Sequence, residues 1–217
     1  MRLFSYTIPF DAGSAPNPYW NLCTLTICKP VIRRVAEIGD WLVGLRSDSV
    51  VYAMKVTDKR SLADHDKFCR SNLVGKIPLW SSKDYRRKVG DCIYDYSNGG
   101  NPVLRESVHD HGNIPTDLGG RFSLMSEDFY YFGKDAIPLP CELLPIVHKR
   151  GHRSNANAPY LDSFISWIRG HEHAHNQVIA DPHMKEQMVD QSCHSSCSQQ
   201  DRIAAEEDER QFQCERA

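Results

Sequence analysis

Two short apolar runs separated by a polar turn constrain the fold of the N-terminal third most strongly. The runs cover 41–45 and 50–57, and the turn between them is Arg46-Ser47-Asp48-Ser49. Short apolar runs that flank turn residues are typical of paired β-strands, so we expect a hairpin here. Gly39-Asp40 precedes the first run and ends a stretch with helical spacing of apolar residues, which predicts a short helix over 29–37.

The same kinds of pattern recur along the chain and indicate an α+β fold. Alternating or aromatic segments predict further strands, and apolar residues at helical spacing predict further helices. The expected strands cover 2–8, 122–125 and 129–132, and the expected helices cover 61–70 and 159–169. We expect these elements to form one domain over 1–168, built on a mostly antiparallel, barrel-like sheet with short peripheral helices.

Charge is distributed unevenly over the 217 residues, although the formal net charge is only −2. Residues 1–153 carry a net charge of +4, and residues 154–217 carry −6. Because residues 169–217 are polar, we expect a tail that is helical to about Ile179 and has little fixed structure after Pro182. An acidic tail of this kind either keeps the chain end solvated or competes with an anionic ligand.

The sequence suggests a cytoplasmic protein. Its first ten residues have too short an apolar run for a secretory signal and are typical of a first strand. No segment approaches the roughly 18 apolar residues that a membrane span needs, so we expect no membrane partner. Eight cysteines in this context favour reduced thiols. Three of them occur singly, and we expect burial as small apolar side chains for Cys69, Cys92 and Cys141.

Aromatic and basic side chains gather around the first helix and suggest a pocket for a base and a phosphate. The candidate binding residues are Tyr19, Trp20, Asn21, Lys29, Arg33, Trp41, His152 and Arg153. Trp20 lies in a Pro- and Asn-containing loop, where a large aromatic side chain favours ligand contact. Two alternatives stay open, because Trp41 also suits a strand in the core and the cations also suit a solvated helix face.

Cysteine and histidine residues offer a second kind of chemistry. A nucleophilic Cys23 or Cys28 needs a nearby base, for which the sequence offers His109, His111 and His152. The spacing of these cysteines does not match a zinc finger, so burial beside the first helix is the simpler interpretation. His171, His173 and His175 precede Cys193 and Cys197, which offers a tail zinc site, but the polar surroundings argue against it. We therefore predict no metal site.

Several sequence blocks within residues 1–168 carry a family resemblance. They are Asn17-Pro18-Tyr19-Trp20, Cys23-Thr24-Leu25, Cys28-Lys29-Pro30-Val31-Ile32-Arg33, Gly39-Asp40-Trp41-Leu42-Val43-Gly44, Val51-Tyr52-Ala53-Met54-Lys55-Val56, Ser126-Glu127-Asp128-Phe129-Tyr130-Tyr131-Phe132-Gly133 and Gly151-His152-Arg153. Together they resemble the second nucleotide-modification-associated domain family of bacteria and phages, found among gene systems that modify DNA bases. The order of elements is also similar, at fold level, to the PUA-like barrels of the EVE, ASCH and YTH groups, which hold modified bases in an aromatic pocket.

Two classes of function follow from these residues and from the resemblance. In the first, the protein binds a modified base or nucleotide in the aromatic and basic pocket, in a DNA-modification or phage-defence setting. Its partners are then nucleotides or DNA with modified bases, together with other proteins of a modification system. In the second, the protein is an enzyme of DNA base modification that uses Cys or His residues near the same pocket. The sequence has no Walker loop, dinucleotide fingerprint or complete zinc-deaminase motif, so we expect no cofactor.

Overall fold

A computed structural model describes residues 1–148 and 150–186. The largest sheet contains β1 (Leu3–Thr7), β3 (Trp41–Arg46), β4 (Ser49–Lys55), β9 (Asp128–Tyr131), β10 (Ile137–Pro138) and β11 (His152–Arg153). Its order is β10-β4-β3-β1-β11, and β9 also pairs with β4. Only β1 and β3 run parallel among these pairs, and the other pairs are antiparallel. The expectation of a mostly antiparallel arrangement is confirmed.

Two smaller sheets and a set of short helices complete the described fold. The second sheet has the order β2-β8-β5, with β2 (Cys23–Leu25), β8 (Phe122–Ser126) and β5 (Asp58–Ser61). The third pairs β6 (Tyr94–Asp95) with β7 (Val103–Leu104). The α-helices are α1 (Pro30–Val35), α2 (Leu62–Asn72), α3 (Tyr85–Lys88), α4 (Ile114–Gly119) and α5 (Leu161–Arg169). Short 3-10 turns are η1 (Val74–Lys76), η2 (His111–Asn113), η3 (Gly133–Asp135), η4 (Cys141–Ile146), η5 (Asn155–Tyr160) and η6 (Glu172–Ala174). No helix among the described residues is both long and apolar enough to span a membrane.

The predicted hairpin is β3 and β4. Leu42 pairs with Met54 in it, and the register shifts by a bulge between Gly44 and Leu45. Its tight turn includes Ser47 in a left-handed conformation, with φ of 55°. Left-handed residues match the twist of paired strands, which explains why a turn this short can join them.

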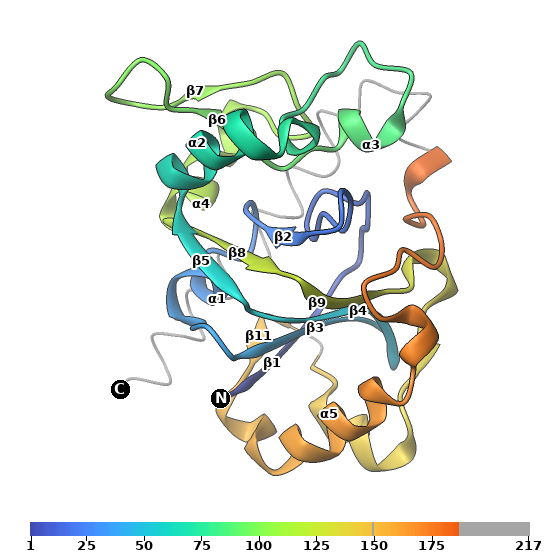
Figure 1. The fold of residues 1–217 in the computed structure, drawn as a ribbon. Coiled ribbons are helices and arrows are strands. Elements are labelled where there is room, and N and C mark those ends of the chain that lie inside the picture. The colour runs from blue at the N-terminus through green and yellow to red at the C-terminus, as the bar shows by residue number, and fades with distance from the viewer. Residues whose placement is uncertain (149, 187–217) are drawn as a thin grey trace.

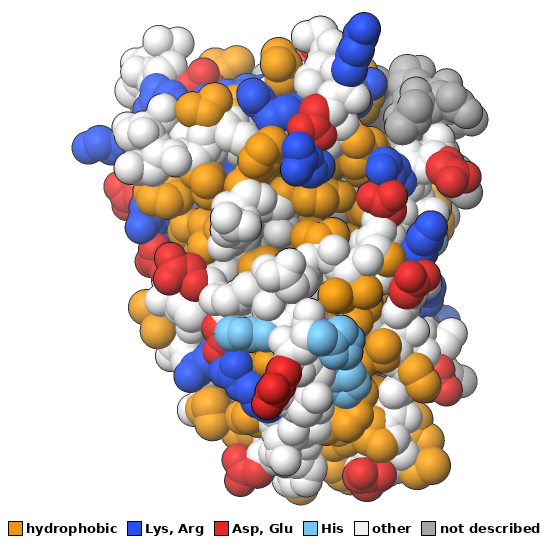
Figure 2. Space-filling view, turned by 45° about the vertical axis from the view of Figure 1, so that its right-hand side comes forward, with side chains coloured by type: hydrophobic (Ala, Val, Ile, Leu, Met, Phe, Trp, Pro, Cys, Tyr) orange, Lys and Arg blue, Asp and Glu red, His pale blue; other side chains and the backbone are white. Residues whose placement is uncertain are grey.

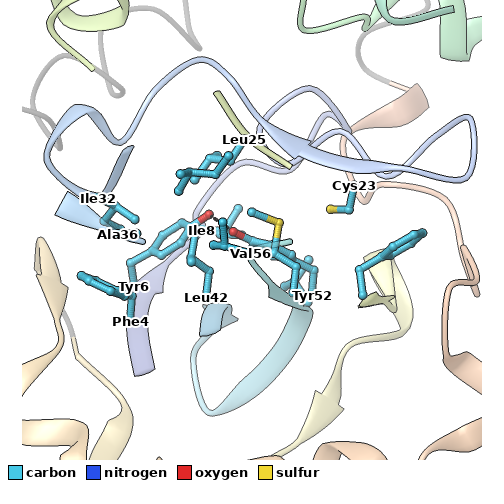
Figure 3. Close-up of a cluster of buried hydrophobic side chains, with 14 of the residues drawn as sticks. Phe4, Tyr6, Ile8, Cys23, Leu25, Ile32, Ala36, Leu42, Tyr52 and Val56 are labelled. Atoms are coloured by element: carbon cyan, nitrogen blue, oxygen red, sulfur yellow. Dashed lines mark hydrogen bonds between the residues drawn. The ribbon is translucent and has the colours of Figure 1, made fainter. Parts of the chain in front are cut away.

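Side chains of the largest sheet alternate between two cores, because successive residues of a strand point to opposite faces. On one face, Phe4, Tyr6 and Tyr52 pack with α1 and with β2 and β8 of the second sheet. Figure 3 shows this cluster, in which the hydroxyls of Tyr6 and Tyr52 lie 2.6 Å apart. On the other face, Trp41 and Val43 pack with α5 and η4, which lie below the sheet in Figure 1.

The barrel-like arrangement that we expected is not confirmed, because no closed barrel is found among the described strands. They form three separate open sheets. Both faces of β1, β3 and β4 are covered by other elements. The architecture is a mixed α+β stack in which the largest sheet is the middle layer.

The segment after α5 also differs from the expected helix. Between residues 170 and 184 it contains the single turn η6, and it runs along β9, with bridges that join Tyr130 to His175 and Tyr131 to Val178. The backbone of residue 134 then donates to the carbonyl of Asp181. The part of the tail from residue 187 onward lies outside the described residues.

Candidate functional site

The loop from Asn17 to Thr24 carries three of the predicted binding residues. Its ends are held by two backbone hydrogen bonds between Asn17 and Thr24, of 2.8 and 2.9 Å. At its tip, Trp20 and Asn21 both have left-handed backbones, with φ of 67° and 58°. Two consecutive left-handed residues make a tight reversal, which projects the indole and the amide away from the strand that follows.

The fully buried side chain of Lys76 holds this loop in place. Its Nζ atom lies within hydrogen-bond distance, at 2.6–2.9 Å, of four loop oxygens that share its three N–H groups, namely Asn17 O, Asn17 Oδ1, Leu22 O and Thr24 Oγ1. Burial lowers the pKa of the ammonium, and the buried carboxylate of Asp91 opposes this shift. Thr24 Oγ1 in turn donates to Asp91 Oδ2 at 2.6 Å. The loop is therefore fixed by a buried charged network rather than by apolar packing alone.

A groove of about 620 Å³ lies beside this loop. Ligand pockets commonly have volumes between about 300 and 1,000 Å³, so a nucleotide fits by size. Three segments form the walls: the loop tip, α3 with the residues before it, and the segment that follows η6. The lining residues are Pro18, Tyr19, Trp20, Asn21, Lys83, Asp84, Tyr85, Arg86, Phe129, Asn176, Gln177, Val178, Asp181 and Lys185. Figure 2 shows this side of the molecule, where Lys and Arg side chains alternate with Asp and Glu in the upper part.

Within the groove, Trp20 and Arg86 form a stacked pair. The guanidinium carbon of Arg86 lies 4.8 Å from the centroid of the indole ring. Asp84 orients the guanidinium through a hydrogen bond of 2.7 Å from Nη2. The indole also rests against Gly75, where a Cβ atom would approach the ring to 2.4 Å. The indole of Trp20 therefore lies between Gly75 and Arg86, and Arg86 is the outer member of the stacked pair.

The structure places two predicted binding residues away from the groove. Arg33 is fully buried, and its guanidinium donates to the backbone carbonyls of Cys28, Asp117 and Phe122 at 2.6–3.0 Å. Since these bonds occupy all three of its nitrogens, Arg33 holds the three backbone segments together. Trp41 is on the opposite face of the largest sheet, edge-on to Phe164 of α5. Its place in the core agrees with the alternative that the sequence left open.

The other three predicted binding residues lie apart from the groove as well. His152 is buried on β11 opposite Tyr6, and Arg153 donates to the carbonyl of Pro145 at 2.7 Å. Lys29 has its Nζ atom 5.0 Å from the centroid of the Tyr6 ring. Lys29 also lines a smaller pocket, of about 20 Å³, together with Cys28 and Tyr6. The expected convergence of eight residues therefore reduces to the three of the loop tip.

Cys28, which lines the smaller pocket, is the first of three buried groups that contact one another in order: a thiol, an imidazole and a carboxylate. Cys28 Sγ lies 3.5 Å from His109 Nε2, and His109 Nδ1 lies 2.6 Å from Asp117 Oδ2. Asp117 also accepts a bond of 2.8 Å from the backbone N–H of Cys28 and one of 3.0 Å from the hydroxyl of Tyr94. Of the three bases that the sequence offered to Cys28, the structure brings His109 beside it.

Asp117 is ionised despite its burial. Burial alone would raise the pKa of the carboxyl, but His109 and Arg33 outweigh it and hold that pKa below its usual range. An ionised carboxylate only accepts hydrogen bonds. The contact with His109 is therefore a charge-assisted bond that fixes the orientation of the imidazole.

A second buried cluster joins His65, Cys69 and Cys92. His65 Nε2 lies 3.5 Å from Cys69 Sγ, and the hydrogen bond with Cys92 lowers the pKa of the Cys69 thiol to about 6. The ligand atoms of the three residues lie within 4.8 Å of one another, which is close enough for one metal ion. Cys69 and Cys92 are buried as expected, whereas Cys141 is exposed because it begins the surface turn η4.

The histidines of the tail segment do not converge in this way. His171 packs edge-on against Trp167, and His175 lies 3.1 Å from Asp128. Figure 2 shows histidine side chains on the surface of this face. Cys193 and Cys197 lie outside the described residues. Among the described residues, the tail histidines do not belong to either cluster of three potential metal ligands.

Sequence reasoning missed several residues that complete these sites. Tyr85, Arg86 and Lys185 line the groove, and Asp117 completes the thiol cluster. The basic run around Arg86 was a detectable signal, but basic runs are more often solvated than bound to a ligand. Asp117 carries no local signal, because it lies 89 residues from Cys28 in the sequence.

Comparison with known proteins agrees with the resemblance seen in the sequence. No curated protein and no solved structure matches the chain closely enough to suggest a relationship. The model of the family called nucleotide modification associated domain 2 matches residues 1–191. This match covers most of the chain, including the groove, the loop that Lys76 holds and both thiol clusters. The chain therefore belongs to the nucleotide modification associated domain 2 family.

Proposed function

We propose that the protein binds a nucleotide, or a modified base within DNA, in the groove beside Trp20. The observation that carries this proposal is the Trp20–Arg86 stack at the groove wall, flanked by Lys83 and Lys185. Bases stack on aromatic rings and on guanidinium planes, and phosphates pair with Lys and Arg side chains. The family membership supports a setting in DNA modification.

In this proposal the base stacks on Arg86, which is held flat by Trp20 beneath it and by Asp84 beside it. Asn21 and Gln177 carry amides on the groove wall, and both side chains are exposed. Amides offer both a donor and an acceptor, so they can read the edge of a base. Lys83 and Lys185 then meet the phosphate. Three cations and two carboxylates line the groove, which leaves a small positive balance for an anionic ligand.

The test is calorimetric titration of the protein with a panel of ordinary and modified nucleotides at low salt. Trp20→Ala and Arg86→Ala should each weaken binding of every base, by roughly tenfold or more, because stacking contributes about 1–3 kcal/mol per base. Gln177→Ala should instead reduce discrimination among bases, since contacts to base edges carry the selectivity. Added salt should weaken binding, as expected for phosphate contacts.

Arg60→Ala provides a matched control. Arg60 stacks on Phe68 at 4.0 Å and pairs with Asp58 at 2.7 Å, so the variant removes the same kind of interaction outside the groove. Its affinity for nucleotides should equal that of the wild type. Equal losses for Arg60→Ala and Arg86→Ala, or no binding by the wild type to any nucleotide, would contradict the proposal.

A further inference from the structure

We propose that Cys28, His109 and Asp117 form a catalytic centre in which the Cys28 thiol attacks the carbonyl carbon of an ester or amide. This inference goes beyond nucleotide binding and does not depend on it. Cys28 is the nucleophile, His109 is the general base, and Asp117 positions the imidazole. Three observations support this assignment: the order of the three groups, the access of Cys28 to a pocket, and the backbone conformation of Cys28.

The order of the groups determines which nitrogen carries the proton. Because the Asp117 carboxylate only accepts, the proton of a neutral His109 ring is on Nδ1, at 2.6 Å from Oδ2. In this tautomer Nε2 carries a lone pair and faces the Cys28 sulfur at 3.5 Å. A base oriented by a third group beside a nucleophile is the arrangement that activates thiols and hydroxyls in acyl transfer.

Distance alone would allow a metal ion here, because the ligand atoms of Cys28, His109 and Asp117 lie within 4.8 Å of one another. A metal ion needs ligand atoms that converge on one point. Here the imidazole lies between the sulfur and the carboxylate, with one nitrogen toward each.

Cys28 reaches the surface through the pocket of about 20 Å³, which holds about one water molecule. Pro9 and Lys29 stand at its mouth, where Pro9 is exposed and Lys29 is half-buried. Cys28 itself has a left-handed backbone, with φ of 56°. Non-glycine residues in this conformation cluster at active sites, where the surrounding structure holds them in place. The small pocket restricts the reaction to a compact acyl group.

The reaction balances with water as the only co-reactant. The Cys28 proton moves to His109 Nε2 while the sulfur forms a bond to the carbonyl carbon, and the carbonyl electrons move onto oxygen. Lys29 supplies a positive charge at the pocket for this oxygen. The carbonyl then re-forms, the bond to the alcohol or amine breaks, and His109 returns the proton to that leaving group. Water, deprotonated by His109, then cleaves the thioester to give the acid and restores the thiol.

One residue that lines the groove contacts one residue that lines the thiol pocket. The hydroxyl of Tyr85, a groove residue, donates to the carbonyl of Ala12 at 2.6 Å. Ala12 lines the pocket of Cys28.

The first test uses the wild-type protein and compares Cys28 with the exposed Cys141. Cys28 is only 6% exposed, so accessibility alone predicts that Cys141 reacts first. The proposal predicts the reverse when folded protein is treated with p-nitrophenyl acetate, a small activated ester. Peptide mapping should place the first acetyl group on Cys28, with a burst of one p-nitrophenolate per chain. Acetylation of Cys141 ahead of Cys28 would overturn the proposal.

Variants then separate catalysis from structure. Cys28→Ser should abolish the burst, and His109→Gln should slow it by about 100-fold or more, the range of general-base catalysis. Cys141→Ser should keep the wild-type rate. If His109→Gln fails to fold, the pH profile of wild-type acetylation replaces it. An acetylation rate that rises with pH as the ionisation of an ordinary thiol predicts would overturn the proposal. Stoichiometric metal that is lost in Cys28→Ser would also overturn it.

Discussion

Replacement of Lys76 by methionine should destabilise the protein and disorder the wall of the groove. Methionine fills a similar volume but donates no hydrogen bond, and the effect can be followed atom by atom. Asn17 O keeps the hydrogen bond that it accepts from the backbone N–H of Thr24. Thr24 Oγ1 keeps the hydrogen bond that it donates to Asp91. Leu22 O loses its hydrogen bond to Nζ, which costs about 1–3 kcal/mol for a buried acceptor.

The larger loss concerns Asp91, whose buried carboxylate then lacks its nearby cation. Leaving one member of a buried pair unpaired costs about 3–5 kcal/mol, so we expect a total near the upper end of this range for Lys76→Met. For a chain of this size a loss of about 5 kcal/mol should lower the melting temperature by roughly 10–20 °C. Calorimetry of Lys76→Met, of the exposed Lys67→Met and of the double variant Lys76→Met/Asp91→Asn tests this reasoning.

Lys67→Met should change stability by no more than about 0.5 kcal/mol, as surface substitutions do. The double variant should recover part of the loss, because it removes the carboxylate charge that Lys76→Met leaves unpaired. Nucleotide affinity should fall in Lys76→Met, since the Trp20 loop loses its anchor. A melting temperature of Lys76→Met equal to that of Lys67→Met would refute the argument.

Three further predictions concern stability. Trp41→Ala should lose about 3–5 kcal/mol in urea unfolding, as large core aromatics do, yet bind nucleotides as the wild type does when folded. Cys69 has a folded pKa lowered to about 6, so the unfolded state binds more protons up to the ordinary thiol pKa of 9.0. Stability should therefore rise with pH across this window, and the rise should be smaller in Cys69→Ser. Burial raises the pKa of Tyr6, Tyr52 and Tyr131, so the folded state retains protons above pH 10.0 and should lose stability as the pH rises further.

Each of these has a distinct contrary result. Loss of nucleotide binding by folded Trp41→Ala would show that Trp41 contributes to the binding site. Parallel pH profiles of wild type and Cys69→Ser in urea would remove the thiolate argument. Tyrosinate absorbance that develops fully before the far-ultraviolet circular dichroism is lost would show that the buried hydroxyls titrate in the folded protein.

The elements with local signals were predictable from the sequence. The hairpin of β3 and β4 follows from two apolar runs and a four-residue turn, and α5 follows from apolar residues at helical spacing. The number of layers could not be predicted from the sequence. Strands that are buried on both faces lack the alternation of apolar and polar residues that would show it. Trp41 illustrates the consequence: its sequence neighbourhood fits either face, and only the packing of α5 decides between them.

The candidate site was predictable only where its residues are adjacent in the chain. Tyr19, Trp20 and Asn21 line the groove as one loop. Arg33 looks like a phosphate ligand in the sequence, but Gly120 leaves the space in which its guanidinium meets three carbonyls. The contact of Cys28 with His109 joins residues 81 positions apart, so spacing rules cannot reveal it. Long-range chemistry of this kind requires the folded chain.

Photo-crosslinking tests the central claim most directly, because it reports where a nucleotide sits. Purified protein would be irradiated with azido nucleotides of purine and pyrimidine type, digested and mapped by mass spectrometry, with excess unmodified nucleotide as competitor. We predict competed crosslinks in the peptides that contain 18–21 and 83–86, and their loss in Trp20→Ala. Competed crosslinks confined to α5 or β11, or crosslinks that unmodified nucleotide does not reduce, would contradict a nucleotide site in the groove.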